Sequence, residues 1–364
     1  MNILKVFMGN AKFHTRVNLL SLLIFFAFSH HLLADQHFEQ LSLRISQTEW
    51  NELMLKMQRL EKAELHLHIG GAWPLDYLRK IAEPQQFSEL SMMLAKIQKG
   101  RINYHDAFKV FGLIGNIVNN NERVQAGVEE ICKSLLNDNV VYAELRTGLK
   151  DLETGLEGHL KAVLEGIRKG TVGTPLKVGL ILSLRRETSY PLADQIVDLA
   201  IKYRNRGVVG IDLSGDSMLG NVKIILPLLS KAKQNGLPIT LHIGESEEET
   251  AENQIMELQT IEPQRIGHGV HLCQEARRWI EENKVLFELC LTSALNTGMI
   301  KKLEDHPGLQ LLQKGHPVAI CTDDPLIFNT SLSQEYAKVA FLTELSVDEI
   351  DKLLKKIMNY RFLP

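Results

Sequence analysis

The sequence is poor in the features that mark several large classes of protein. It has four cysteines in 364 residues and contains no Cys-x-x-Cys pair. Cys290 and Cys321 lie in apolar, strand-like runs, which favours buried free thiols over disulfides. The formal net charge is −3 and no basic run is present. Nothing in the composition therefore indicates a nucleic-acid partner.

A long apolar run is also missing near the N-terminus. The run over residues 17–28 is too short to span a bilayer. It follows Lys5, Lys12 and Arg16 and ends at the small residues Ala27 and Ser29, as in a secretory signal peptide. An uncleaved anchor, or a start assigned upstream of a cytoplasmic protein, would give the same pattern. We expect residues 1–34 to be a signal peptide or N-terminal extension, and the mature protein to be secreted or periplasmic, without a stable membrane span; the alternative is a cytoplasmic protein.

The rest of the chain has the composition of a globular protein. With 45% hydrophobic and 23% charged residues, it can bury the core of one large barrel or of two ordinary domains. Residues 35–62 are expected to form an N-terminal helical segment. Eight short apolar segments follow, separated by helical segments, with a long helical stretch over residues 75–136. The expected strands span residues 63–69, 140–146, 176–184, 208–213, 238–243, 265–270, 285–291 and 317–322.

This alternation predicts parallel strands joined by helical crossovers. Eight such units indicate an α/β fold, a single-domain (β/α)8 TIM barrel over residues 63–364 with a helical insertion after the first strand. An open doubly wound sheet is the alternative, but it usually has a glycine-rich phosphate loop after its first strand. Here that position holds His66, His68, Gly70 and Gly71 instead.

His66 and His68 are the first candidates for metal binding. Residues two apart on a strand point to the same face, so the two imidazoles should lie side by side. Neutral imidazole is the commonest metal ligand. A pair of half-buried structural histidines would show the same spacing, so the other ligands must come from elsewhere in the chain.

Further polar residues interrupt the strands near their carboxyl ends, which open on one mouth of a barrel. With His66 and His68, the side chains of His242 and Asp323 would supply three nitrogens and one carboxylate oxygen. This set suits one Zn²⁺ better than Fe²⁺, Mn²⁺ or Co²⁺. Each residue alone could be an ordinary strand-end residue, but the four together favour a metal site. The same mouth should receive Glu144, Arg146, Asp212, Ser214, Asp216, Glu245, His268 and Asp324.

Two of these residues could move protons beside a metal. Glu245 lies three residues after His242, so its carboxyl can face the cavity without being a ligand. His268 lies between Gly267 and Gly269, which leave room for close approach, and it could orient or deprotonate an attacking water. A capping role for Glu245 and a packing role for His268 remain open.

Two more positions could contact a planar substrate ring. The side chain of Asp324 can accept or donate a hydrogen bond there. The backbone of Gly215 can do the same, because a glycine lets a ring come close. We expect His271 to be a supporting or surface residue rather than a ligand.

In chain order, the motifs at these positions closely resemble those of the adenosine/AMP deaminase family of metal-dependent hydrolases. The resemblance implies a barrel with one Zn²⁺, attack of metal-bound hydroxide on carbon 6 of a purine, and release of an amine. Glu245 matches the residue that passes a proton to the purine ring, and His268 matches the residue that orients the water. The residues that match the metal ligands are His66, His68, His242 and Asp323. Those that match substrate contacts are His68, Gly215 and Asp324. The motifs are Glu64-Leu65-His66-Leu67-His68, Gly210-Ile211-Asp212-Leu213-Ser214-Gly215-Asp216, Leu241-His242-Ile243-Gly244-Glu245, Arg265-Ile266-Gly267-His268-Gly269 and Cys321-Thr322-Asp323-Asp324-Pro325.

Features of two branches of the family are mixed. Residues 212–216, 288–293, 320–324 and 332–336 resemble the adenosine deaminase-like branch, whose members act on 6-N-methyl-AMP, whereas residues 324–328 resemble the adenosine-acting enzymes. Gly70 stands where relatives usually carry Asp or Asn, a side chain that contacts the sugar in the adenosine-acting enzymes. The absence of a carboxylate there favours a 5′-phosphate, although a different sugar, or none, is also open.

The sequence therefore predicts a zinc-dependent purine aminohydrolase, an enzyme that deaminates adenosine or a closely related 6-amino or 6-methylamino purine nucleoside or nucleotide. One alternative is an enzyme specific for AMP forms such as 6-N-methyl-AMP. Another is a non-catalytic binding protein on a deaminase scaffold, but no ligand is lost and Glu245 is kept. A two-metal amidohydrolase with a bridging lysine is disfavoured, because no lysine interrupts the fourth expected strand, residues 208–213.

Overall fold

The computed structural model describes the chain except for residues 1–40, 42–43, 99–103, 217–218, 220–221 and 363–364. The expected signal segment, residues 1–34, lies outside the described residues. A turn at residues 44–46 precedes α3 (Gln47–Arg59), so the expected continuous helix is interrupted there. The interruption follows from Ser46, whose hydroxyl accepts a hydrogen bond from the N–H of Glu49 at 3.3 Å, as an N-cap does. Among the helices described, we find none with the length and apolarity needed to cross a membrane.

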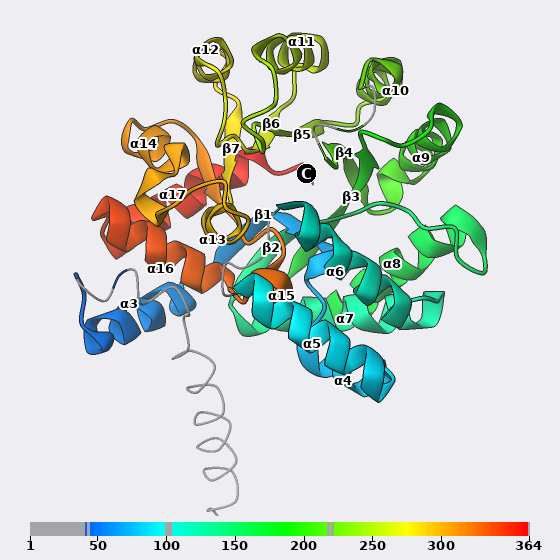
Figure 1. The fold of residues 1–364 in the computed structure, drawn as a ribbon, viewed down its shortest axis with the longest axis horizontal. Helices are drawn as coiled ribbons and strands as arrows, with labels where there is room; N and C mark the ends of the chain where they lie inside the picture. Colours follow the sequence, from blue (N-terminus) through cyan, green and yellow to red (C-terminus); the bar gives the residue numbers. More distant parts are fainter. Residues whose placement is uncertain (1–40, 42–43, 99–103, 217–218, 220–221, 363–364) are drawn as a thin grey trace, which may run out of the picture. The chain divides into compact units, whose positions relative to one another are not determined.

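Eight parallel strands pair in sequence order and make a nearly closed barrel (Figure 1). Such strands are apolar throughout because helices cover their outer face and side chains fill the interior. Every residue of β4 is buried, for example. The strands are β1 (Lys62–His68), β2 (Val140–Thr147), β3 (Lys177–Arg185), β4 (Val208–Ser214), β5 (Ile239–Ile243), β6 (Arg265–His268), β7 (Leu286–Leu289) and β8 (Val318–Ile320).

The barrel closes between its first and last strands at two of the residues expected to bind metal. Leu67 pairs with Asp323 in an isolated parallel bridge. The N–H of His68 donates to the carbonyl of Asp323, and the N–H of Asp323 donates to the carbonyl of His66, both at 2.9 Å. The predicted (β/α)8 fold is confirmed, and its closure holds β1 and the residues after β8 in register at the mouth.

Helices surround the barrel and alternate with its strands (Figure 1). Between β1 and β2 the chain forms the expected helical insertion instead of a single crossover helix. The insertion comprises α4 (Leu75–Ile81), α5 (Pro84–Gln98), α6 (Tyr104–Ile117) and α7 (Asn121–Asn137). The other long helices are α8 (Gly155–Thr171), α9 (Tyr190–Tyr203), α10 (Val222–Gln234), α11 (Ala251–Ile261), α12 (Gln274–Glu282), α16 (Leu332–Thr343) and α17 (Val347–Ile357).

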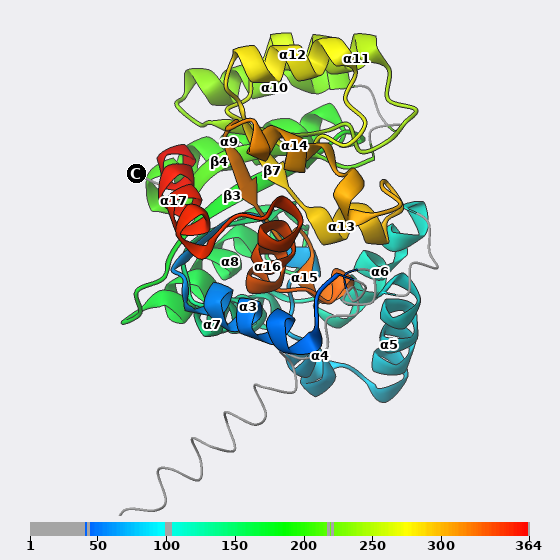
Figure 2. The ribbon, with the colours of Figure 1, turned by 90° about the vertical axis from the view of Figure 1, so that its left-hand side faces the viewer.

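The two ends of the barrel carry different elements. Figure 2 shows α6 and α13 (Leu291–Asn296) toward one end of the strands and α17 toward the other. Residues of α6 and α13 line the cavity at the carboxyl ends of the strands. Near the amino end of β6, the guanidinium of Arg265 lies 3.7 Å from the ring centre of Phe362, whose N–H donates to Glu144 at 2.5 Å.

Several short helices were not predicted, and the last three strands are shorter than expected. The missed helices are α13, α14 (Pro307–Gln313) and α15 (Pro325–Phe328), which are too short to show a helical period in the sequence. Strand β6 ends at His268 because the backbone there turns to a φ of 63°, a left-handed conformation that cannot continue a strand.

Candidate active site

A cavity of about 580 Å³ opens at the carboxyl ends of the strands. It is where a (β/α)8 barrel carries its functional groups. His66 is fully buried beside it, and His271 is not among its lining residues. Of the residues expected at the mouth, Glu144, Asp212 and Asp216 do not line the cavity, and Glu144 pairs with Arg265 instead. The structure brings the residues predicted for metal binding, proton transfer and ring contact to one place, although they come from β1, β5, β6 and the segments that follow β4, β5 and β8. Those lining the cavity are His68, Gly215, His242, Glu245, His268, Asp323 and Asp324.

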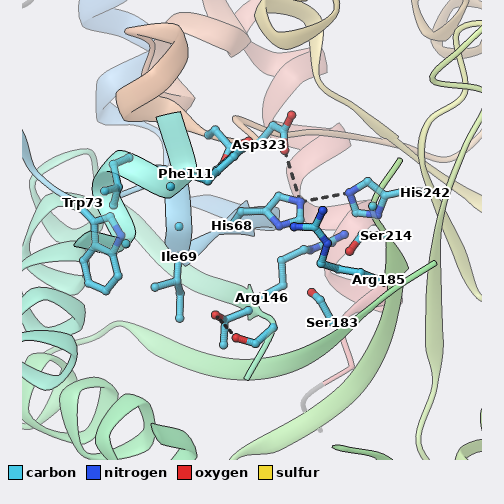
Figure 3. A pocket seen from close by; sticks show the side chains of 18 of the residues that line it. His68, Ile69, Trp73, Phe111, Arg146, Ser183, Arg185, Ser214, His242 and Asp323 are labelled. Atoms are coloured by element: carbon cyan, nitrogen blue, oxygen red, sulfur yellow. Dashed lines mark hydrogen bonds and ion pairs between the residues drawn. The ribbon is translucent and has the colours of Figure 1, made fainter. Parts of the chain in front are cut away.

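The four predicted metal ligands point toward one another (Figure 3, which labels three of them). The Nε2 atoms of His68 and His242 are 3.1 Å apart. Asp323 Oδ1 lies 3.5 Å from His68 Nε2 and 3.3 Å from His66 Nε2. The rings of His66 and His242 have their centres 4.7 Å apart. These four side chains can therefore converge on one ion.

Carboxylates behind two of the histidines fix which ring nitrogen faces the cavity. Glu288 lies 2.6 Å from His66 Nδ1, and Asp212 lies 2.8 Å from His242 Nδ1. Each contact leaves Nε2 as the nitrogen available to a metal, the usual arrangement behind a ligating histidine. Sequence reasoning placed Asp212 at the mouth without this role and assigned none to Glu288. The sequence feature that could have identified Glu288 is a charged residue inside an apolar strand.

Arg146 joins these two carboxylates beneath the site. The fully buried guanidinium lies 3.0 Å from Glu288 and 3.5 Å from Asp212. Burial alone would raise the pKa of Glu288, but the charges of Arg146 and Arg265 and the contact with His66 hold it well below its usual value. In the same way, His242 and Arg146 outweigh burial and lower the pKa of Asp212. Both carboxylates stay ionised at neutral pH.

The residues present fit a bound divalent metal. His66 Nε2 is buried and makes no hydrogen bond to any residue that the structure describes, which leaves a costly unsatisfied atom unless an ion binds it. The Nε2 atoms of His68 and His242, 3.1 Å apart, also lie close enough to bind one ion together. His268 and Asp212 come close enough to join the set in other combinations, but Asp212 already bonds to His242 Nδ1.

Asp323, three residues after the end of β8, and His268, the last residue of β6, adopt unusual backbone conformations at the site. Asp323 has a φ of 64° and His268 a φ of 63°, a left-handed region that non-glycine residues seldom enter. The Ser293 hydroxyl donates to Asp323 Oδ2 at 2.7 Å and holds the carboxylate in place. Strained conformations of this kind persist where the surrounding structure enforces them, and they often mark functional sites.

His268 lies next to the predicted proton shuttle. Its Nε2 is 3.7 Å from Glu245 Oε1 and 4.0 Å from Asp323 Oδ2. Burial, outweighing the opposing charge of Asp323, lowers the pKa of His268 to about 4. The ring is therefore neutral at neutral pH, and the lone pair on one of its nitrogens can accept a hydrogen bond from a water molecule.

The pKa of Asp324 is raised, whereas that of His268 is lowered. Burial and the adjacent Asp323 raise its pKa well above the usual value, and its Oδ1 is buried without a hydrogen bond from the described part of the chain. A neutral carboxyl can donate a hydrogen bond. Gly71 makes room for it, because a Cβ at position 71 would lie 2.0 Å from Asp324 Oδ1.

The lining of the cavity also includes basic side chains that sequence reasoning missed. Lys150 and His159 line it, together with Arg185 at the end of β3. His159 Nδ1 accepts the N–H of Lys150 at 3.1 Å, so in the neutral ring the proton sits on Nε2. Among the described residues, no carboxylate pairs with Lys150, whose side chain is exposed to solvent. Arg185, in contrast, pairs with Glu187.

Gly70 faces an aromatic side chain. A Cβ at this position would lie 3.3 Å from Phe111 Cδ1, so the ring of Phe111 restricts the space that a larger residue would need. Figure 3 shows Phe111, Trp73 and Ile69 grouped on the side of the cavity away from His242.

Comparison with known proteins agrees with this site. A family model described as adenosine deaminase matches residues 61–364. The chain belongs to the adenosine deaminase family. It is therefore a hydrolase of the deaminase type, and its His and Asp cluster is a possible metal site of that family.

Characterised relatives in this family include enzymes named for two substrates. An N6-methyl-AMP deaminase of Danio rerio is 30% identical over 86% of this chain and 93% of the relative. An adenosine deaminase of Enterococcus faecalis is 31% identical over 85% of this chain and 94% of the relative. The protein in the crystal structure of Arabidopsis ADAL complexed with IMP is 31% identical in sequence to this chain. The two structures match with a TM-score of 0.77 over 84% of this chain and 93% of that one.

Proposed function

We propose that this family member is a zinc-dependent deaminase of 6-amino or 6-methylamino purines and that it prefers the nucleoside 5′-monophosphate. The convergence of His66, His68, His242 and Asp323 with Glu245, His268 and Asp324 in one cavity supports the reaction. Water would add at carbon 6 of the purine, and the 6-amino group would leave as ammonia or methylamine. A Zn²⁺ held by the three histidines and Asp323 would make water nucleophilic at neutral pH.

The protein's own residues would handle the protons and the ring. The neutral His268 would accept a proton from the attacking water at a ring nitrogen. Glu245 would give a proton to a nitrogen of the purine ring, which becomes more basic as carbon 6 is attacked. Asp324, kept neutral by burial and by Asp323, would donate a hydrogen bond to another ring nitrogen. The Gly215 backbone would contact the opposite edge.

The preference for a 5′-phosphate rests on two cations in the cavity lining, Lys150 and Arg185. His159 lies beside Lys150 as a neutral ring, because burial lowers its pKa to about 4, and it can donate a hydrogen bond from Nε2. The carboxylates among the described lining residues are Glu245, Asp323 and Asp324. No carboxylate occupies position 70 to repel a phosphate. The names of the Danio rerio relative and of the IMP complex of the plant relative support a nucleotide. The Enterococcus faecalis relative supports adenosine as the second candidate.

Ultraviolet absorbance assays with adenosine, AMP and 6-N-methyl-AMP test the proposal. We expect the zinc-loaded protein to deaminate the two monophosphates with a higher kcat/KM than adenosine, and the variant Glu245→Gln to be inactive on all three. Lys150→Met should reduce kcat/KM for the monophosphates about 10- to 100-fold, the worth of a hydrogen bond to a charged group, and leave adenosine unaffected. Lys161→Met is the matched control, because Lys161 is exposed on α8 and pairs with Glu157. Equal losses on adenosine and AMP would remove Lys150 from phosphate recognition.

A further inference from the structure

The turn after β5 carries Glu245 and is held in an unusual conformation. Gly244 has a φ of 68°, and a Cβ there would lie 3.2 Å from Leu272. This left-handed residue turns the chain directly after Ile243 and directs Glu245 into the cavity. A carboxyl that transfers a proton needs placement to within a fraction of an ångström, so whatever fixes this turn governs Glu245.

One buried side chain closes the turn. Glu249 Oε2 accepts the N–H of Gly244 at 2.6 Å. In addition, the N–H of Glu249 donates to the carbonyl of Ser246 at 3.2 Å. The side chain of residue 249 thus ties the end of the segment back to its start, and Glu245 lies inside the closed loop. On the other side, the carbonyl of Gly244 accepts the N–H of His271 at 2.8 Å.

A buried cation lies behind the same turn. Arg186 pairs with both oxygens of Glu257 at 2.5 and 2.9 Å, and it also donates to the carbonyl of His242 at 2.7 Å. Arg186 and Glu257 are each about 97% buried. The charge of Arg186 also acts on Glu249 and Glu245. Arg186 therefore holds the turn at the carbonyl of His242, and Glu249 holds it at the N–H of Gly244.

The carboxyl of Glu249 is buried away from solvent. Glu249 is 9% exposed, and its Oε1 is buried without a hydrogen-bond partner among the residues described. Burial raises the pKa of Glu249 to about 7. Burying a carboxyl with one oxygen unsatisfied destabilises the folded state. We therefore expect the hydrogen bond between Glu249 and Gly244 to have a role that compensates for this loss of stability.

We propose that Glu249 is a positioning residue for Glu245, acting through its hydrogen bond to the Gly244 backbone. The inference rests on the proposed function, in which Glu245 moves the proton. Glu249 does not touch the substrate in this account. Its loss would let the turn relax and displace Glu245, and so would slow the chemical step without weakening substrate binding.

Two variants and a neighbouring control separate this role from a general structural one. Glu249→Ala removes the hydrogen bond and should lower kcat about 100-fold, the loss expected for a misplacement of about 1 Å, with KM changed less than about threefold. Glu249→Gln keeps a carbonyl oxygen that can accept the Gly244 N–H and should restore most of kcat. Glu248→Ala is the control, because Glu248 is exposed one residue away.

Hydrogen exchange of the peptide spanning residues 243–249 tests the contact without any substrate. We expect faster exchange in Glu249→Ala than in the wild type, and wild-type exchange in Glu249→Gln and Glu248→Ala, at unchanged melting temperature. If the wild type deaminates no purine, the proposed function fails while the exchange data still decide the contact. Unchanged exchange in Glu249→Ala, an unchanged kcat, or a loss confined to KM would overturn the inference.

Discussion

Asp212 and Glu288 decide which nitrogen of two histidines can reach a metal. Each carboxylate accepts a hydrogen bond from Nδ1 of its histidine, at 2.8 and 2.6 Å, and Arg146 keeps both ionised. An ionised carboxylate can only accept a hydrogen bond, so the opposite nitrogen, Nε2, is left with its lone pair free.

Replacing Asp212 by Asn should therefore weaken metal binding about 10- to 100-fold. The amide can turn its NH₂ toward His242, which would move the ring proton to Nε2 and block ligation. Competition with a chromophoric chelator would measure the affinity for Co²⁺ or Zn²⁺. Ser183→Ala serves as the control, since the Ser183 hydroxyl donates to the other oxygen, Asp212 Oδ2, at 2.9 Å. An unchanged affinity in Asp212→Asn would contradict this assignment.

At the scale of elements, helix α14 depends on a histidine that stays neutral. His306 precedes Pro307, and its Nδ1 accepts the N–H of Gly308 at 3.1 Å, as an N-cap does. Burial, with the charges of His268 and His271, lowers the pKa of His306 from 6.5 to about 3. A protonated ring would lose this acceptor.

The pH dependence of stability follows from this shift. Between about pH 3 and 6.5, the unfolded chain binds a proton at His306 that the folded chain does not bind, so the free energy of unfolding falls as the pH falls. By about pH 5 the loss from His306 amounts to about 2 kcal/mol. His306→Asn keeps a capping oxygen but does not titrate, so its denaturant-derived free energy should fall less steeply below pH 6.5. Parallel profiles for the two proteins would exclude this role.

The sequence predicted the eight strands and the residues at their ends because period, length and flanking residues are local properties. It also placed Arg146 and Asp212 at the mouth, since strand parity and chain direction suffice for that. It could not pair Arg146 with Glu288, because that contact joins residues 142 positions apart. Nor could it find the bond between Glu249 and Gly244, which depends on the rotamer of one side chain. The short helix α13 was missed for lack of a helical period.

At the scale of the whole molecule, residues 1–34 bear on where the protein is located. We propose that residues 1–34 direct export and are removed. Expression of the full chain should then yield an exported product whose intact mass shows cleavage between about residue 29 and residue 35. Leu22→Arg, which interrupts the apolar run, should leave the product inside the cell at full length. Full-length protein retained by the wild type would instead support the cytoplasmic alternative.

Purine deamination by this protein should require a metal at the barrel mouth. The direct measurement combines elemental analysis of the purified protein with its turnover of 6-N-methyl-AMP before chelation, after chelation and after return of Zn²⁺. We predict one zinc per chain, loss of turnover on its removal and recovery on its return. Turnover that persists in metal-free protein, or a fully zinc-loaded and folded protein that deaminates no 6-amino purine, would contradict the account.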